Sequence, residues 1–134
     1  MPSEPIVLQE SDVPLEEWAD PVRGEVGFRT LFGGAGGGAT ATDSLTAGLT
    51  ELGPGGWLGL HRHEPSEVYY VVAGEGTVVL DGAECTVGAG SAVFIPGDVE
   101  HGIRNTGEDT LRFFYAFAVS SFEDIEYRFS AHPS

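Results

Sequence analysis

Lysine is absent from the 134 residues of this chain, and arginine supplies all six of its Lys/Arg side chains. Because a side-chain amine is needed for a Schiff base, the absence of lysine excludes that chemistry. The six arginines are outnumbered by 21 acidic residues, which gives a formal net charge of -15 at pH 7. A chain this acidic is repelled by nucleic acids and by anionic membranes, so we expect neither as a partner.

Cysteine occurs once, at Cys85, so no disulfide can form within the chain. No basic residue stands near it, and we expect a small core residue rather than a nucleophile. The sequence has no apolar run as long as a membrane-spanning helix. Its first residues, MPSEPIVLQE, lack the basic and apolar regions of a secretion signal, so a cytoplasmic location is expected.

Short β-rich runs separated by turn residues dominate the sequence from Leu45 onward. Runs such as EVYYVVA, TVVL and SAVFI alternate with the turn signals GEG, DG and PGD. The pair Asp81-Gly82 between two apolar runs is typical of a two-residue hairpin. No long stretch has helical periodicity, so the pattern predicts an all-β sandwich or barrel, and the length predicts a single domain.

We divide the chain into an N-terminal extension (1–25), a β-barrel (26–120) and a C-terminal segment (121–134). In the extension, the run PLEEWAD is expected to form a short helical turn with Trp18 as a packing anchor. The glycine-rich run 33–38 lacks the Lys-Ser/Thr pair and the helix that follow a phosphate-binding loop. It is therefore expected to be a flexible surface loop.

Two of the four histidines stand one residue apart in the run GWLGLHRH. Residues i and i+2 of a strand share a face, so His61 and His63 lie about 6.5 Å apart along the strand. The short connection EPS would bring Glu67 back beside His63, and His101 follows on a later strand. Two imidazoles and a carboxylate on one sheet face form a competent site for a first-row metal ion. Burying these groups without an ion would be costly.

The spacing of these residues resembles the two sequence motifs of the cupin superfamily. The first motif, G(X)5HXH(X)3E(X)6G, is matched by Gly55, His61, His63, Glu67 and Gly74. The second motif, G(X)5PXG(X)2H(X)3N, is matched by Gly90, Pro96, His101 and Asn105. Its middle glycine is replaced by Asp98, a residue type that also tolerates positive φ in turns.

The resemblance implies a single-domain jelly-roll barrel, the double-stranded β-helix, that holds one divalent transition metal ion. The implied ligands are His61, His63, Glu67 and His101. Iron, manganese, nickel, zinc, cobalt and copper all accept such ligands, so the sequence leaves the identity of the ion open. Because cupins are commonly dimers, the resemblance also implies a homodimer.

Three kinds of function are open to such a site. The metal could act as a Lewis acid in a lyase or isomerase that takes a small carboxylate-bearing substrate. It could instead activate oxygen in a dioxygenase, or the barrel could bind a small molecule without catalysis. Tyr69 favours the first, because it lies on the strand face of Glu67 and is a candidate general base. Trp57 is expected to wall the substrate pocket, and in LRFFYAFAV either Tyr115 with Phe117 or else Phe114 faces the interior.

The run from SLTAGLTEL to IEYRF also resembles the cupin-type lyases that cleave dimethylsulfoniopropionate into dimethyl sulfide and acrylate. The shared features are the order HXHXPXEXY and a closing FXXXEY segment. The resemblance implies that Tyr69 removes the α-proton, that Tyr127 assists, and that the metal holds the substrate carboxylate. An aromatic face such as that of Trp57 would suit the sulfonium group.

Overall fold

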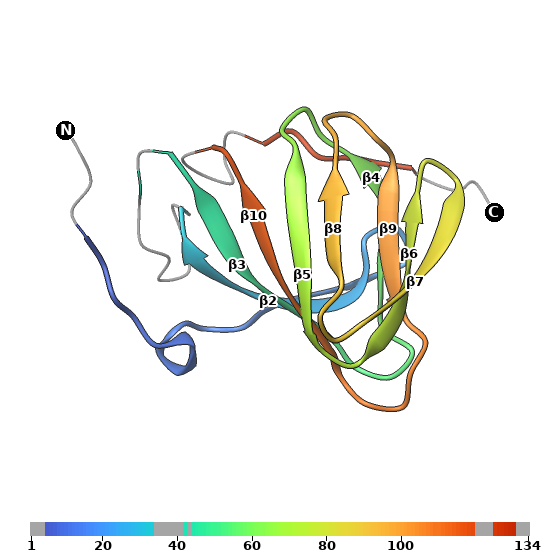
Figure 1. The fold of residues 1–134 in the computed structure, drawn as a ribbon, viewed down its shortest axis with the longest axis horizontal. Helices are drawn as coiled ribbons and strands as arrows, with labels where there is room; N and C mark the ends of the chain where they lie inside the picture. Colours follow the sequence, from blue (N-terminus) through green and yellow to red (C-terminus); the bar gives the residue numbers. More distant parts are fainter. Residues whose placement is uncertain (1–4, 34–41, 43, 120–124, 131–134) are drawn as a thin grey trace.

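The computed structural model describes residues 5–33, 42, 44–119 and 125–130, in which almost all regular structure is β-strand (Figure 1). In chain order the strands are β1 (Glu16–Asp20), β2 (Gly24–Phe32), β3 (Thr46–Leu52), β4 (Trp57–Arg62), β5 (Glu67–Ala73), β6 (Glu75–Leu80), β7 (Ala83–Gly88), β8 (Ala92–Ile95), β9 (His101–Asn105), β10 (Leu111–Phe117) and β11 (Arg128–Phe129). A single 3-10 turn, η1 (Glu10–Asp12), precedes the strands in this part of the chain. The described residues include no helix that is long and apolar enough to span a membrane. The predicted all-β, single-domain architecture is confirmed.

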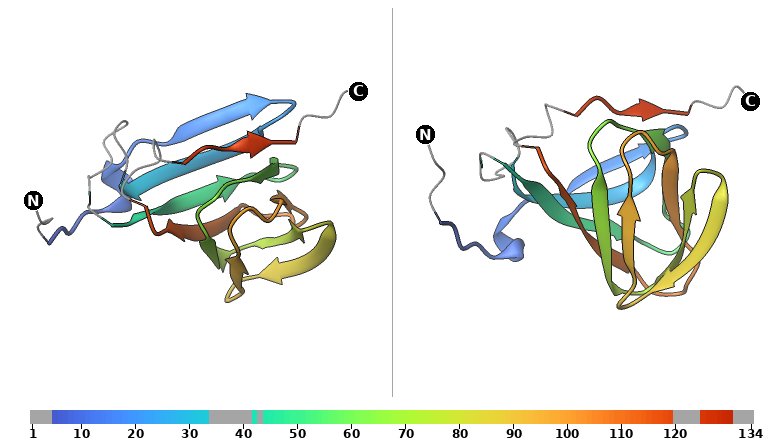
Figure 2. Two further views of the ribbon diagram at one scale, coloured as in Figure 1. Left: turned by 90° about the horizontal axis from the view of Figure 1, so that it is seen from above. Right: turned by 45° about the horizontal axis from the view of Figure 1, so that its top comes forward.

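All the strands belong to one antiparallel sheet with the order β7-β6-β9-β4-β2-β3-β10-β5-β8. Strand β1 adds to β2, and the short β11 adds to β4. The sheet curls on itself into a half-barrel, as the views in Figures 1 and 2 show. The curl turns the inner faces of β4, β5, β9 and β10 toward a shared interior.

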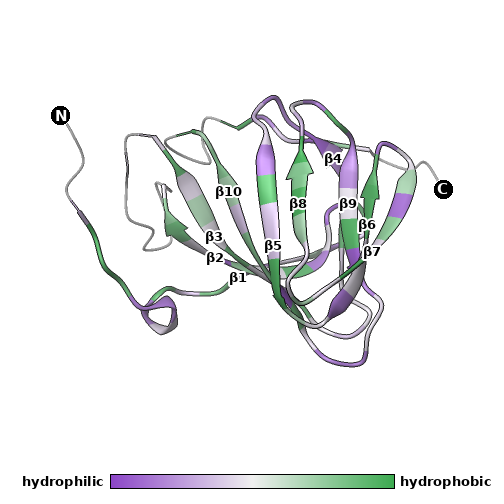
Figure 3. Cartoon of the chain, viewed as in Figure 1, coloured by the Kyte–Doolittle hydropathy of each residue, from purple (hydrophilic) through white to green (hydrophobic). Residues whose placement is uncertain are grey.

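Side chains alternate between the interior and the outer surface along the strands that enclose this interior. In β5, Glu67 and Tyr69 are buried whereas Val68 and Tyr70 are exposed. Hydropathy does not follow this alternation, since Figure 3 shows hydrophilic and hydrophobic residues along β5 and only hydrophobic ones along β8. The interior-facing position of Tyr69 therefore follows from a regular strand, as the sequence predicts.

Strand β10 settles the alternative that the sequence left open. Phe113, Tyr115 and Phe117 are buried, and Phe114 is half-buried on the opposite face. Tyr115 and Phe117 therefore face the interior.

Two expected turn conformations are present. Asp81 and Gly82 have φ angles of 49° and 83° and join β6 to β7, where Leu80 pairs with Ala83. This is the predicted two-residue hairpin. Asp98, which replaces the motif glycine, has a φ of 63°. It adopts the left-handed conformation that the glycine would have supplied.

The prediction of a helical turn in PLEEWAD is wrong, because the last five residues of this run form strand β1. Trp18 pairs with Val26 of β2, and its ring packs edge-on against Phe28 with ring centroids 5.0 Å apart. Pairing with a strand outside the local sequence overrides the weak local preference. Cys85, expected in the core, is exposed on β7, a strand at the end of the sheet order. Most of the glycine-rich run 33–38 lies outside the described residues.

We predict that Gly24 is required for the junction of β2 with β4. Its φ is +111°, and an added Cβ would lie 2.1 Å from the carbonyl oxygen of Trp57. Gly24→Ala should therefore lower the free energy of unfolding by about 2–4 kcal/mol, since backbone strain and a steric clash act together. Gly82→Ala is the control, because Gly82 also has a positive φ but has no atom within 4 Å of an added Cβ. Gly82→Ala should lower the free energy of unfolding by only about 1–2 kcal/mol. Equal losses of unfolding free energy in the two variants, measured by urea unfolding, would contradict the prediction.

Candidate metal centre

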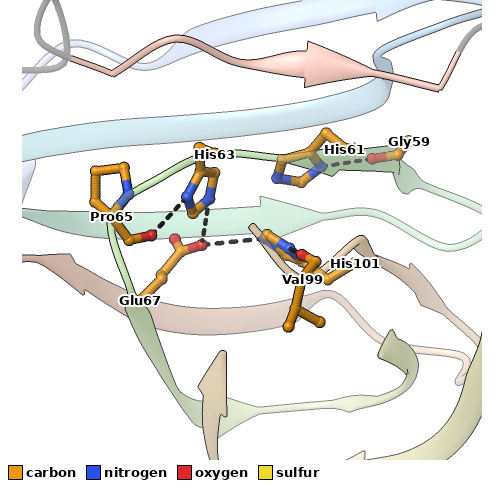
Figure 4. A network of polar contacts seen from close by, with 7 residues as sticks. All are labelled: Gly59, His61, His63, Pro65, Glu67, Val99 and His101. Carbon is orange, nitrogen blue, oxygen red and sulfur yellow. Dashed lines mark hydrogen bonds and ion pairs between the residues drawn. The ribbon is translucent and has the colours of Figure 1, made fainter. Parts of the chain in front are cut away.

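The curled sheet brings three histidines and one glutamate together in its interior, from β4, β5, β9 and the residue that follows β4 (Figure 4). His61 lies in β4 and pairs with His101 at the start of β9. His63 follows the end of β4, and Glu67 begins β5. The backbone N–H of Asp98 donates to the carbonyl oxygen of His63 at 2.7 Å, which fixes the connection before β9 against the end of β4. The motif residues are thus positioned by strand pairing and by two turns.

The four side chains are buried and close together. Ligand atoms of His61, His63 and His101 all lie within 4.8 Å of one another. Oε1 of Glu67 lies 3.2 Å from Nε2 of His63 and 3.2 Å from Nε2 of His101. The four residues that the sequence predicts as metal ligands therefore lie together in the structure.

A backbone carbonyl fixes the orientation of each imidazole ring. The Nδ1 atoms of His61, His63 and His101 lie 2.7, 2.8 and 2.9 Å from the carbonyl oxygens of Gly59, Pro65 and Val99. A carbonyl oxygen only accepts hydrogen bonds, so each Nδ1 must carry the proton. In a neutral ring Nε2 then has a free lone pair, and metal-binding histidines are commonly oriented by such contacts.

The nitrogen and oxygen atoms that face one another in the cluster are better suited to binding a cation than to bonding with each other. A neutral imidazole Nε2 and a carboxylate oxygen are both acceptors, so at 3.2 Å they repel each other unless a proton or a cation lies between them. Three imidazole nitrogens and one carboxylate oxygen are a ligand set that divalent first-row metals accept. The described residues therefore fit a metal ion.

The environment of His61 keeps its imidazole neutral. Burial is the main cause that lowers its pKa from 6.5 to about 3, and the nearby imidazoles of His101 and His63 act in the same direction. The carbonyl of Gly59 opposes the shift without cancelling it. The Nε2 lone pair of His61 is thus available to a metal ion throughout the neutral pH range.

A cavity of about 50 Å³ adjoins the cluster. Its lining residues are Trp18, Val26, Phe28, Thr50, Leu58, His61, Glu67, Tyr69, Phe113, Tyr115, Phe117 and Tyr127. The ring centroid of Tyr69 lies 6.3 Å from that of His101, and the ring centroid of Tyr127 lies 5.3 Å from that of His63. Both predicted catalytic tyrosines and Tyr115 therefore line the space next to the candidate metal centre.

The three tyrosines of the cavity hold their protons strongly in the metal-free chain. Burial is the first cause that raises the pKa of Tyr69 well above 10, and the negative charge of Glu67 adds to it. The same two causes raise the pKa of Tyr127. Burial also raises the pKa of Tyr115, whose hydroxyl lies 3.4 Å from Oγ1 of Thr30. Added positive charge is needed before any of these phenols can act as a base.

Trp57, expected to wall the pocket, does not line this cavity, and Leu58 does. The pairing of β4 with β9 shifts register between Leu58 and His61. The inward and outward positions of the side chains before the shift therefore cannot be inferred by counting every second residue back from His61. A glycine inside a strand often marks such an irregularity, and Gly59 was the available signal. Trp18 was expected only to anchor packing, yet it lines the cavity from β1.

Residues 48–117 match the cupin domain family, and this chain belongs to that family. Over 131 residues it is 44% identical to dimethylsulfoniopropionate lyase DddW of Ruegeria pomeroyi, a match that covers 98% of this chain and 84% of that protein. A 39% identical match to the oxalate-binding protein of Thermotoga maritima covers 47% of this chain and 53% of that protein. The solved structure of the polyketide cyclase RemF from Streptomyces resistomycificus superposes with a TM-score of 0.78 and 26% identity, covering 98% of this chain and 89% of that one. The resemblance to cupins and to their lyases is confirmed.

We predict that bound metal depends on these histidines. His61→Ala and His101→Ala should each lose most of the metal that elemental analysis finds in the wild-type protein, because each removes one of four ligand atoms. Cys85→Ala is the control, since it removes an exposed thiol, a type of group that metals bind, from a position outside the cluster. Full metal occupancy in either folded histidine variant would place the site elsewhere.

The buried His61 should also make the metal-free protein sensitive to acid. In the unfolded chain its imidazole takes up a proton below about pH 6.5, whereas in the folded chain it does so only near pH 3. The unfolded state binds the extra proton between these values, so the free energy of unfolding falls as pH drops from about 6.5 toward 3. His61→Phe should reduce this slope by up to about 1.4 kcal/mol per pH unit. Urea unfolding of the wild-type protein and of His61→Phe at pH 7 and pH 5 measures this slope. An equal change in the free energy of unfolding in both proteins would contradict the prediction.

Proposed function

We propose that this chain is a metal-dependent lyase that removes a leaving group from a small carboxylate-bearing substrate, as dimethylsulfoniopropionate lyases do. The observation that carries the proposal is the position of Tyr69. Its side chain lies on the inner face of β5 with that of Glu67, and both line the cavity beside the histidines. The identity of 44% to DddW over nearly the whole chain supports the same reaction class.

The proposed cofactor is one divalent transition metal ion. Held by His61, His63, Glu67 and His101, it would bind the substrate carboxylate and supply the positive charge that offsets the raised pKa of Tyr69. Three neutral imidazoles add no charge, so the single carboxylate of Glu67 leaves a divalent site with a net positive charge. The proposal requires no change in the oxidation state of the ion, so it is compatible with each of the metals that the ligand set accepts.

In the proposed step Tyr69 acts as the base. Its phenolate oxygen accepts the proton from the carbon next to the substrate carboxylate. The electron pair of that C–H bond forms the new C=C bond, and the pair of the C–S bond leaves with the sulfur. Dimethylsulfoniopropionate would thus give acrylate, neutral dimethyl sulfide and one proton. Tyr127 is half-buried beside His61 and His63, and we assign it the transfer of that proton from Tyr69 toward solvent.

The dioxygenase and the non-catalytic alternatives have less support. The match to the oxalate-binding protein covers 47% of the chain, whereas the match to the lyase covers 98%. Because a β-elimination consumes no oxygen, oxygen uptake during turnover separates the two enzymatic alternatives. The absence of any turnover in the metal-loaded protein would favour the binding module.

We predict that Tyr69→Phe separates catalysis from metal binding. The variant keeps the ring and its packing against Phe113, whose centroid is 4.4 Å away, but loses the proton acceptor. Metal content should be unchanged, and the rate of acrylate release from dimethylsulfoniopropionate should fall by about 10²- to 10⁴-fold. Tyr70→Phe is the matched control, because Tyr70 is the next residue on the same strand and is exposed on the outer face.

Two results would contradict the proposal. Nearly full activity in Tyr69→Phe would mean that another group is the base. One oxygen molecule consumed for each substrate molecule would instead establish the dioxygenase alternative.

A further inference from the structure

The lining of the cavity changes from fully buried to half-buried residues. His61, Glu67, Tyr69 and Phe113 are buried. Trp18, Phe28, Leu58 and Tyr127 line the same cavity and are half-buried. The first set therefore forms the floor and the second set forms the mouth. The cavity thus runs from the buried ligand cluster to half-buried residues, so a substrate held at the floor by one end has its other end at the mouth.

The lining also limits which chemical groups the mouth can recognise. No lysine or arginine is among the described residues that line the cavity, so no fixed cation there could pair with an anionic group. The lining is instead rich in aromatic rings, and such cages bind quaternary ammonium and similar ligand cations. The net charge of -15 repels simple anions and attracts cations as they approach. All three features favour a positively charged group at the mouth.

Trp18 is the ring at the mouth best suited to a cation, because indole has the strongest cation–π attraction of the aromatic side chains. The guanidinium carbon of Arg23 already lies 4.7 Å from its ring centroid. Arg23 is paired with Asp20, with Nε 2.6 Å from Oδ2, and hydrogen bonds from the Arg23 backbone and side chain lower the pKa of Asp20 to about 2. The carboxylate of Asp20 offsets the charge of Arg23 and so weakens the repulsion of a second cation near the ring.

We infer that Trp18 is a specificity-determining residue that selects substrates with a fixed positive charge, a sulfonium or a quaternary ammonium group, over plain carboxylates. The inference rests on the proposed function, since the substrate carboxylate lies at the floor with the histidines and Glu67. The onium group then lies at the mouth against the indole of Trp18. Strand β1 thereby belongs to the binding site as well as to the sheet.

Two ligands of the same shape test this inference in the metal-loaded protein. One is 3-(trimethylammonio)propanoate, and the other is 4,4-dimethylpentanoate, in which carbon replaces the charged nitrogen. Their carboxylates are identical, so contacts at the floor cancel in the ratio of the two dissociation constants measured by calorimetry. We expect the charged ligand to bind about 5- to 30-fold more tightly to the wild-type protein.

Trp18→Leu should lower this preference by about fivefold or more, with little change in the affinity for the neutral ligand. Trp57→Leu is the matched control, because the second tryptophan of the chain does not line the cavity, and it should leave the ratio unchanged. Trp18→Phe keeps a weaker aromatic face and should lower the ratio by a smaller factor, which provides a second test if the leucine variant fails to fold.

No preference in the wild-type protein would overturn the inference, and so would an unchanged ratio in the folded Trp18 variants. Binding and turnover are separate measurements. A protein that binds with the expected ratios but releases no acrylate would overturn the lyase proposal and leave the role of Trp18 standing. A protein that releases acrylate but shows no preference for the charged ligand would overturn the role of Trp18 and leave the lyase proposal standing.

Discussion

The candidate site depends on three hydrogen bonds between imidazole Nδ1–H groups and backbone carbonyls. These contacts, from His61, His63 and His101, place the proton on the outer nitrogen of each ring and leave the inner Nε2 with a lone pair. Glu67 adds a carboxylate oxygen 3.2 Å from two of the inner nitrogens. A buried set of acceptors that face one another is unfavourable on its own, so the strands hold the side chains in an arrangement that a cation stabilises.

The curled sheet supplies the second constraint, which is the common direction of the side chains. Glu67 and Tyr69 are two residues apart on β5, so a regular strand turns the metal ligand and the proposed base toward the same interior. The apolar surroundings that bury Tyr69 also raise its pKa. The same burial that positions the phenol therefore makes its reactivity depend on positive charge nearby, which links metal binding to proton transfer.

The sequence predicts the parts of the site that follow from regular strands and short turns. His61, His63, Glu67 and His101 come together because two motifs have fixed spacing, and Asp81-Gly82 forms its hairpin from local turn chemistry alone. Features that depend on partners distant in sequence are not predicted. Trp57 is displaced from the cavity by a register shift between β4 and β9, and Trp18 reaches it because β1 pairs with β2. Neither the shift nor the pairing can be read from local alternation.

The most direct test of the metal centre is an anomalous difference map from crystals of the metal-loaded protein, recorded at the absorption edge of the bound metal. We predict a single peak about 2.0–2.2 Å from Nε2 of His61, His63 and His101 and from a carboxylate oxygen of Glu67. Each Nδ1 should still face the carbonyl oxygen of Gly59, Pro65 or Val99. A peak elsewhere in the molecule, or a metal bound through Nδ1 of these rings, would contradict the prediction.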